Sequence, residues 1–222
     1  MRSLRLIASA LGALATVGLT PAAGAAQQRA VDWRDSWYWG AYGGYTSFNT
    51  KLASTNAPTI GIDWVITRSQ FALNLFAEQS YFNAVSTVRD FATAADRKVD
   101  ITDMRRVGFS AMYFTPPVKA IKPYVGLGYA FNFIKTGNPQ GSCCGAGAGA
   151  RDSVLSRINS ARSTGRVFGN LGLMATIGRF APFAQYTVMP SQGNGSFFLN
   201  GEGFTNVWTA GVRYNIGSSI EK

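Results

Sequence analysis

Four charged side chains stand out because they lie among small and polar neighbours in otherwise alternating segments: Asp63, Glu78, Arg106 and Arg213. Two carboxylates and two guanidinium groups can form two ion pairs. A buried charge without a partner is very costly, so we expect each of these residues to be paired. We predict that Glu78 pairs with Arg106 and that Asp63 pairs with Arg213. Such pairs either fix the packing of an interior or act as a gate that opens when partners exchange, and the sequence leaves both interpretations open.

Enzymatic chemistry is disfavoured because the chain contains no histidine. Histidine is the most common general base, and a serine nucleophile would need a base from elsewhere. No other group of residues supplies one, so an esterase-like enzyme is the least favoured function. Two cysteines without histidine also provide too few of the usual zinc ligands. We therefore expect a non-enzymatic protein with no catalytic, cofactor or metal site.

The two cysteines, Cys143 and Cys144, are adjacent in a glycine-rich segment. Neighbouring cysteines can bond to each other only through a strained small ring, so they do not form an ordinary disulfide framework. A vicinal disulfide, an intermolecular bridge and two free thiols are all compatible with the sequence.

A basic segment follows the cysteines. Val154, Leu155, Ile158 and Ala161 occur at helical spacing after a candidate N-cap, Asp152. The same segment carries three cationic residues, Arg151, Arg157 and Arg162. One hypothesis is a short amphipathic helix lying on a lipopolysaccharide surface. The other is a loop tip whose apolar residues are incidental.

Strands must position these residues, because from Trp37 onward polar and apolar residues alternate with the period of two typical of β-structure. Eight such runs are predicted: Trp37–Phe48, Pro58–Ile66, Gln70–Phe82, Met104–Thr115, Lys122–Ile134, Gly165–Ile177, Ala181–Met189 and Phe204–Ile216. Most are close to the roughly 9–11 residues that a tilted strand needs to cross a bilayer. Only 14% of the residues are charged, against roughly a quarter in ordinary soluble domains, so much of the surface is expected to avoid water.

The predicted connections alternate between long and short. In order they are Asn49–Ala57, Thr67–Ser69, Asn83–Asp103, Pro116–Ile121, Lys135–Thr164, Gly178–Phe180 and Pro190–Gly203. An outer-membrane barrel has an even number of strands, short periplasmic turns and longer extracellular loops. The sequence therefore predicts an all-β fold, an eight-stranded antiparallel up-and-down transmembrane barrel.

One face of each predicted strand is apolar, and the other face carries small and polar residues. In the fifth run Leu127, Phe131 and Phe133 oppose Gly126 and Gly128. A soluble barrel would carry many Lys and Glu on its polar face, whereas glycine suits the crowded interior of a narrow barrel. We therefore expect the apolar face to point outward. Aromatic girdles at its edges are expected to include Trp33, Trp37, Trp39, Tyr45, Trp64 and Tyr214.

The N-terminus has the pattern of a secretory signal. Arg2 and Arg5 precede an apolar stretch, and Ala23-Gly24-Ala25 supplies the small residues that signal peptidase reads. An uncleaved anchor is disfavoured because the apolar stretch is short. The expected organisation is a signal peptide over 1–25, a periplasmic segment over 26–36, the barrel over 37–216 and a tail over 217–222.

Both ends of the predicted barrel resemble a known family. The segments Trp37-Tyr38-Trp39-Gly40-Ala41-Tyr42-Gly43-Gly44-Tyr45 and Thr209-Ala210-Gly211-Val212-Arg213-Tyr214-Asn215-Ile216 are similar to the first and closing strands of the OmpA/OmpX-like small outer-membrane β-barrels. Thr209, Gly211, Tyr214 and Ile216 also resemble the signal that the barrel-assembly machinery reads in that family. The chain departs from many relatives by continuing for six residues, Gly217–Lys222, beyond this signal.

These observations predict a structural or surface-interaction protein of a Gram-negative outer membrane, with at most a small gated conductance. The alternative is a barrel that binds or transports a small amphiphile on an inner lining of Tyr38, Tyr42, Tyr124 and Met174. The net charge of +10 is compatible with anionic lipid and lipopolysaccharide as partners, and equally with charges that only keep the loops solvated. The basic residues lack the dense clustering with aromatics that nucleic-acid binding requires. We expect a monomer.

Overall fold

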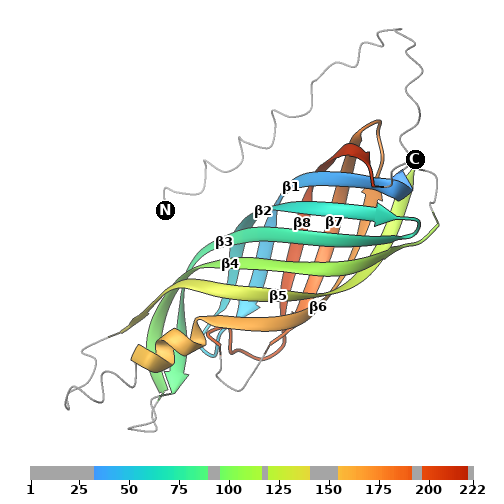
Figure 1. The fold of residues 1–222 in the computed structure, drawn as a ribbon. Helices are drawn as coiled ribbons and strands as arrows, with labels where there is room; N and C mark the ends of the chain where they lie inside the picture. The colour runs from blue at the N-terminus through green and yellow to red at the C-terminus, as the bar shows by residue number, and fades with distance from the viewer. Residues whose placement is uncertain (1–32, 90–95, 117–119, 141–154, 192–196, 220–222) are drawn as a thin grey trace, which may run out of the picture. The chain divides into compact units, whose positions relative to one another are not determined.

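The computed structural model describes residues 33–89, 96–116, 120–140, 155–191 and 197–219. Eight antiparallel strands form a closed barrel in which each strand pairs with the next and β1 pairs with β8 (Figure 1). The elements are a 3-10 turn, η1 (Trp33–Asp35), followed by β1 (Ser36–Asn49), β2 (Ser54–Arg68), β3 (Phe71–Arg89), β4 (Asp96–Phe114), β5 (Ile121–Pro139), β6 (Ser163–Ala175), β7 (Phe180–Pro190) and β8 (Phe204–Ser218). The predicted fold class is confirmed.

The barrel has two different ends. The short-turn end holds the first residues of β1, the last residues of β8 and the connections after β2, β4 and β6. The loop end holds the connections after β1, β3, β5 and β7. Within the described ranges, no helix has the length and apolar character needed to span a membrane.

Two of the predicted long connections are wrong, because strand pairing continues through them. The predicted loop Asn49–Ala57 is a turn between Asn49 and Ser54, in which the Thr50 hydroxyl accepts hydrogen bonds from the backbone N–H groups of Leu52 and Ala53. Most of Asn83–Asp103 is strand, so that β3 and β4 have 19 residues each. A register shift between Ser80 and Asn83 interrupts this pairing without ending it.

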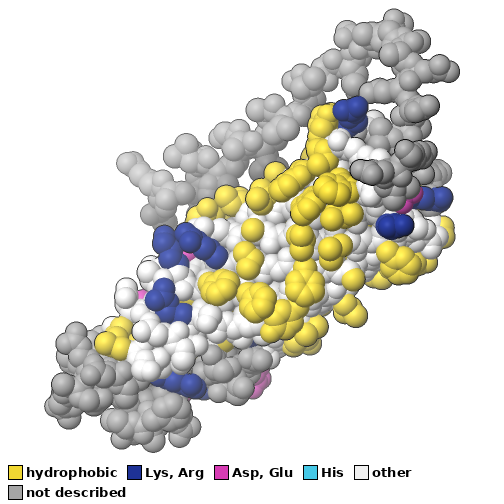
Figure 2. Space-filling model, viewed as in Figure 1, with side chains coloured by type: hydrophobic (Ala, Val, Ile, Leu, Met, Phe, Trp, Pro, Cys, Tyr) yellow, Lys and Arg dark blue, Asp and Glu magenta, His cyan; other side chains and the backbone are white. Residues whose placement is uncertain are grey.

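The outward apolar face is confirmed. Leu127 is 71% exposed, and large hydrophobic side chains on every strand are exposed as well. They form a band over the middle of the barrel wall, and Lys and Arg side chains gather towards its ends (Figure 2). Four of the predicted girdle residues, Trp37, Trp39, Tyr45 and Tyr214, are exposed on this face.

The remaining two girdle residues differ from each other. Trp64 stacks on Trp39 with ring centroids 5.7 Å apart and so belongs to the outer face. Trp33 does not: η1 turns over the short-turn end, and the Trp33 ring packs 5.2 Å from the ring of Phe114, which is fully buried. The prediction for Trp33 is therefore wrong, because this residue helps to cover the interior.

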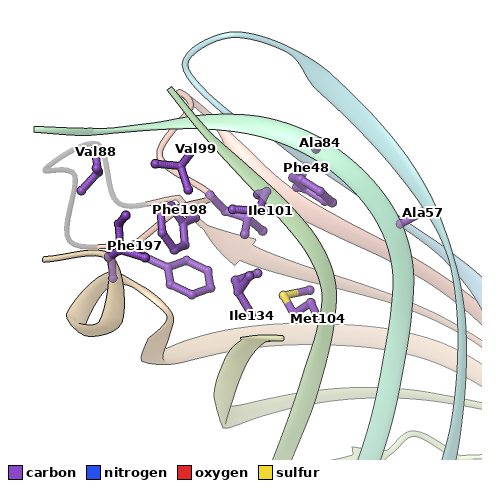
Figure 3. Packing of buried hydrophobic residues seen from close by; sticks show 13 residues of the cluster. Phe48, Ala57, Ala84, Val88, Val99, Ile101, Met104, Ile134, Phe197 and Phe198 are labelled. Carbon is purple, nitrogen blue, oxygen red and sulfur yellow. The ribbon is translucent and has the colours of Figure 1, made fainter. Parts of the chain in front are cut away.

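The interior is filled in layers. At the short-turn end, Tyr38, Phe114, Tyr124, Met174 and Phe183 form part of one apolar cluster. At the loop end a second apolar cluster lies beneath residues that follow β7 (Figure 3). The four charged residues that the sequence singles out are all buried between these two layers.

Candidate functional site

The first ion pair spans three strands. Asp63 on β2 and Arg213 on β8 are both register partners of Gly40 on β1, which lies between them. Because Gly40 has no side chain, the two charged groups meet above it. Arg213 donates from Nε and Nη2 to Oδ2 of Asp63, at 2.9 and 2.7 Å, and both side chains are buried. The structure thus brings Asp63 and Arg213 together as the sequence predicts.

Aromatic and sulfur groups complete the surroundings of Arg213. Its guanidinium carbon lies 3.7 Å from the ring centroid of Phe183 and 6.0 Å from that of Tyr124. Nη1 lies 3.7 Å from Sδ of Met174. A cation over an aromatic face is attracted by the ring quadrupole, so these rings favour the guanidinium in a position away from water.

The second ion pair joins neighbouring strands. Glu78 on β3 and Arg106 on β4 are register partners, and Nη2 of Arg106 donates to Oε1 of Glu78. The other carboxylate oxygen accepts a hydrogen bond of 3.0 Å from the hydroxyl of Tyr42. Tyr42 fits here because a Cβ on Gly61 would lie 2.5 Å from its ring. The pair predicted from the sequence therefore gains a third member that sequence reasoning assigned to a ligand lining.

The space between the two pairs is small. Asp63, Glu78 and Arg106 contribute to the walls of an enclosed cavity of about 20 Å³. A cavity of this size holds about one water molecule. On its loop-end side, the hydroxyls of Thr46, Thr59 and Ser80 are joined by hydrogen bonds of 2.7 to 3.1 Å. Apolar side chains, among them Phe76 and Phe168, line the same cavity. The middle of the barrel is thus a packed layer of charged, hydroxyl and apolar groups with no room for an organic ligand among the described side chains.

The residues predicted as an amphiphile lining are packed against other side chains. Tyr38, Tyr124 and Met174 are fully buried in the apolar cluster at the short-turn end. The hydroxyl of Tyr124 donates to Oε1 of Gln185 at 3.0 Å. Lys122, whose Nζ lies 5.0 Å from the centroid of the Trp33 ring, borders the same end. These residues form a packed layer rather than the wall of a ligand cavity.

At the loop end, the segment 197–201 folds into the mouth of the barrel, and we call this segment the plug. Phe197, Phe198 and Leu199 are buried against Ile101 and other residues of the walls (Figure 3). Sequence reasoning placed them in the long connection Pro190–Gly203. The run of three apolar residues inside a predicted loop is the signal that could have identified the plug.

Hydrogen bonds fix the backbone of the plug to the walls. The Ser86 hydroxyl donates to the carbonyl of Phe198 at 2.5 Å. Asn200 donates from Nδ2 to the carbonyl of Thr87 at 2.9 Å and accepts from the N–H of Lys51 at 3.1 Å. The N–H of Gly201 donates to the carbonyl of Asn49 at 3.1 Å. The plug therefore contacts β1, β3 and the turn after β1.

Arg166 on β6 contacts the plug from the opposite wall. The guanidinium lies 5.0 Å from the centroid of the Phe197 ring. Nη1 of Arg166 donates to the carbonyl of Pro190, the last residue of β7, at 3.0 Å. Sequence reasoning missed Arg166, because a single arginine at the edge of a strand gives no local sign of what it contacts.

The basic segment before β6 is helical over 155–161. Its apolar residues Ile158 and Ala161 are buried in the cluster beneath the plug, so the predicted placement of this face on a lipopolysaccharide surface is wrong. Arg162 is held by the barrel as well, with Nε donating to the carbonyl of Ile134 at 3.2 Å. Arg157 lies in the same helix, whereas Arg151, Cys143 and Cys144 lie outside the residues that the structure describes.

Comparisons with known proteins identify the fold alone. Neither a family model nor a curated protein matches the sequence. The crystal structure of Neisserial surface protein A is similar with a TM-score of 0.52 at 13% identity, over 81% of this chain and 97% of that one. Ail, the attachment invasion locus protein of Yersinia pestis, has 11% identity and a TM-score of 0.46, over 82% of this chain and 99% of that one. Outer membrane protein OprG from Pseudomonas aeruginosa has 12% identity and a TM-score of 0.48, over 85% of this chain and 100% of that one.

Proposed function

We propose that this chain is a non-enzymatic β-barrel of the outer membrane of a Gram-negative bacterium, exported by a signal peptide over 1–25. The exposed apolar band supports a location in lipid, because such a band is unfavourable in water. The similarity in fold to Neisserial surface protein A supports the same location. The residues Thr209, Gly211, Tyr214 and Ile216 on β8 would present the barrel to the assembly machinery.

The filled interior is the observation that supports a role at the surface of the barrel and not as a pore. An apolar layer at the short-turn end, two ion pairs around a cavity of about 20 Å³ and the plug follow one another along the barrel axis. Permeation would require breaking buried ion pairs, which is costly. The barrel therefore acts through its surface, with at most a small conductance when the interior rearranges.

The loop end offers the surface for such interactions. At about 3.3 Å per residue and a tilt of about 40°, a strand of 19 residues rises about 48 Å, against a hydrocarbon core of about 30 Å. β3, β4 and β5 therefore extend well beyond the apolar band as one sheet. The extension carries exposed charges, among them Lys98 and Lys135, and would present a rigid surface to partners outside the cell.

The location is tested by comparing the mobility of the protein from isolated outer membranes on gels, with and without boiling. A closed barrel resists detergent, so we expect the unboiled form to migrate differently from the boiled form. Recovery of the protein in the soluble periplasm without such a shift would refute the proposed location.

The sealed interior is tested in planar lipid bilayers with the purified barrel. We expect the wild-type protein to show no steady conductance, and a variant with Phe197→Ala and Phe198→Ala to show only a small one, because the ion pairs still close the middle layer. A large steady conductance from the wild-type barrel would instead indicate a porin.

A further inference from the structure

A groove crosses the outer wall over β1 to β4. It consists of two adjoining shallow hollows, both open to the outside, which share Ile62, Ala77 and Val107 in their walls. The larger one, which we call the upper hollow, extends towards the loop end as far as Gln79, Tyr81 and Arg105. The smaller one, which we call the lower hollow, extends towards the short-turn end as far as Trp39 and Trp64. Both lie on the face that carries the apolar band.

The groove results from the order of small and large side chains across the sheet. Ala41, Ile62, Ala77 and Val107 are successive register partners on β1 to β4, so small and large residues alternate in one row. The row nearer the short-turn end contains Trp39, Trp64 and Leu75, which are all larger. Ala77 therefore forms the floor of a depression that is bordered by larger side chains.

The loop end of the groove carries a cation. Arg105 is exposed on the outer face, and it has no ion pair within the part of the chain that the structure describes. Its register partners are Gln79 on β3 and Phe133 on β5. Phe133 is an exposed aromatic of the apolar band, so Arg105 lies at the level where this band ends.

The length of the groove matches one lipid leaflet. From Leu75 to Tyr81 the wall of the groove follows six residue steps of β3, which is about 20 Å along the strand. With a tilt of about 40° this corresponds to a depth of about 15 Å, or about half of the hydrocarbon core. A chain that fills the groove would thus have its polar end at Arg105.

We propose that this groove binds one anionic, phosphate-bearing membrane lipid, with an acyl chain over Ala77 and the phosphate on Arg105. The inference rests on the proposed membrane location. A guanidinium forms bidentate, charge-assisted hydrogen bonds with phosphate, and Gln79 and Tyr81 provide further polar groups beside it. An acyl chain bound in the groove would make closer van der Waals contact with Ala77 than loosely packed bulk lipid does.

The test uses quenching of tryptophan fluorescence by bromine-labelled lipid, because Trp39 and Trp64 line the lower hollow. The full barrel is reconstituted in vesicles of phosphatidylcholine with a minority of phosphatidylglycerol. Bromine is placed either on the phosphatidylglycerol or on an equal amount of the phosphatidylcholine, so that only the labelled headgroup differs. One basic residue at an anionic surface is worth about fivefold in binding, and we expect a preference of about that size for the anionic lipid.

Two variants remove the two parts of the site separately. Arg105→Gln removes the charge, and Ala77→Leu fills the groove while Arg105 stays. Both residues point outward, and both variants are expected to lose the preference. The matched controls are Arg68→Gln, an exposed cation at the short-turn end, and Ala184→Leu, an exposed alanine on β7. Both controls are expected to keep it.

Equal quenching by the two labelled lipids in the wild-type barrel would overturn the lipid site while leaving the membrane location intact. So would an unchanged preference in Arg105→Gln. Cross-linked dimers that disappear in Ala77→Leu would assign the groove to a second copy of the chain instead. Absence of quenching by either lipid would overturn the proposed location, and this inference with it.

Discussion

Arg213 directs two hydrogen bonds at a single oxygen of Asp63, Oδ2, from Nε at 2.9 Å and from Nη2 at 2.7 Å. The other oxygen, Oδ1, has no hydrogen-bond partner among the described residues and faces Gly40. The two residues are 150 positions apart in the chain, and they meet only because β1 pairs with both β2 and β8. The pair therefore depends on closure of the barrel.

Asp63→Asn is predicted to lower the free energy of unfolding by about 3–5 kcal/mol, because it leaves the buried Arg213 guanidinium without a counter-charge. The measurement is urea unfolding of the barrel in lipid vesicles. Asp103→Asn is the matched control, since Asp103 pairs with the exposed Lys135 at 3.5 Å and such pairs contribute at most about 1 kcal/mol. Equal losses in the two variants would contradict the prediction.

Gly40→Ala is predicted to destabilise the barrel by about 1–3 kcal/mol through overpacking. A Cβ at this position would lie 2.8 Å from Cγ of Arg213 and would also overlap Oδ1 of Asp63. Gly43→Ala on the same strand is the control, because its Cβ would meet nothing closer than a backbone oxygen at 3.8 Å. Gly43→Ala is expected to be neutral or slightly stabilising. Unfolding in urea distinguishes the two variants, and a larger loss at Gly43 would refute the argument.

The sequence was sufficient to predict both ion pairs because strand periodicity and antiparallel order determine which side chains share a face and a depth. Glu78 and Arg106 belong to one hairpin, and Asp63 and Arg213 both flank the first strand once the barrel closes. The alternation also identified the outer face, since glycine and polar residues occupy the other side. These features follow from local pattern and simple topology.

The plug and the extension of β3 and β4 could not be predicted in this way. Ser86, Val88, Val99 and Ile101 continue the strands because their inward side chains contact the plug at 197–201. That contact joins segments more than 90 residues apart. Val99 and Ile101 alternate with polar neighbours as in a strand, but the segment gives no local sign of the distant contact. The spacing of apolar residues makes a helix at 155–161 one of two hypotheses, and the surface that its apolar face contacts depends on the same distant packing.

Asn200→Ala is predicted to loosen the plug, because Asn200 bonds to both Lys51 and Thr87. Leaving these backbone groups unpaired costs about 1–3 kcal/mol. Hydrogen exchange at the amide of Gly201, which donates to the carbonyl of Asn49, should accelerate by about tenfold or more, the equivalent of about 1.4 kcal/mol. Asn138→Ala, at an exposed position of β5, should leave this exchange rate unchanged. Unchanged exchange in Asn200→Ala would show that the plug is held without the hydrogen bonds of Asn200.

Arg105 and Arg106 offer the sharpest comparison, because these neighbours point to opposite sides of the wall. Arg106 is buried against Glu78, whereas Arg105 is exposed on the outer face. Arg106→Ala is predicted to cost about 3–5 kcal/mol, since the buried Glu78 carboxyl would lose its ion-pair partner. In vesicles of phosphatidylcholine alone, Arg105→Ala should change the free energy of unfolding by no more than about 0.5 kcal/mol.

The same two variants separate packing from gating in planar bilayers. If the pair of Glu78 and Arg106 closes the middle layer, Arg106→Ala should show brief conducting events that neither the wild-type barrel nor Arg105→Ala shows. A loss of stability without conductance would assign the pair to packing alone, because the plug and the short-turn end would still seal the barrel. Unchanged stability together with unchanged conductance in Arg106→Ala would contradict both roles of the pair.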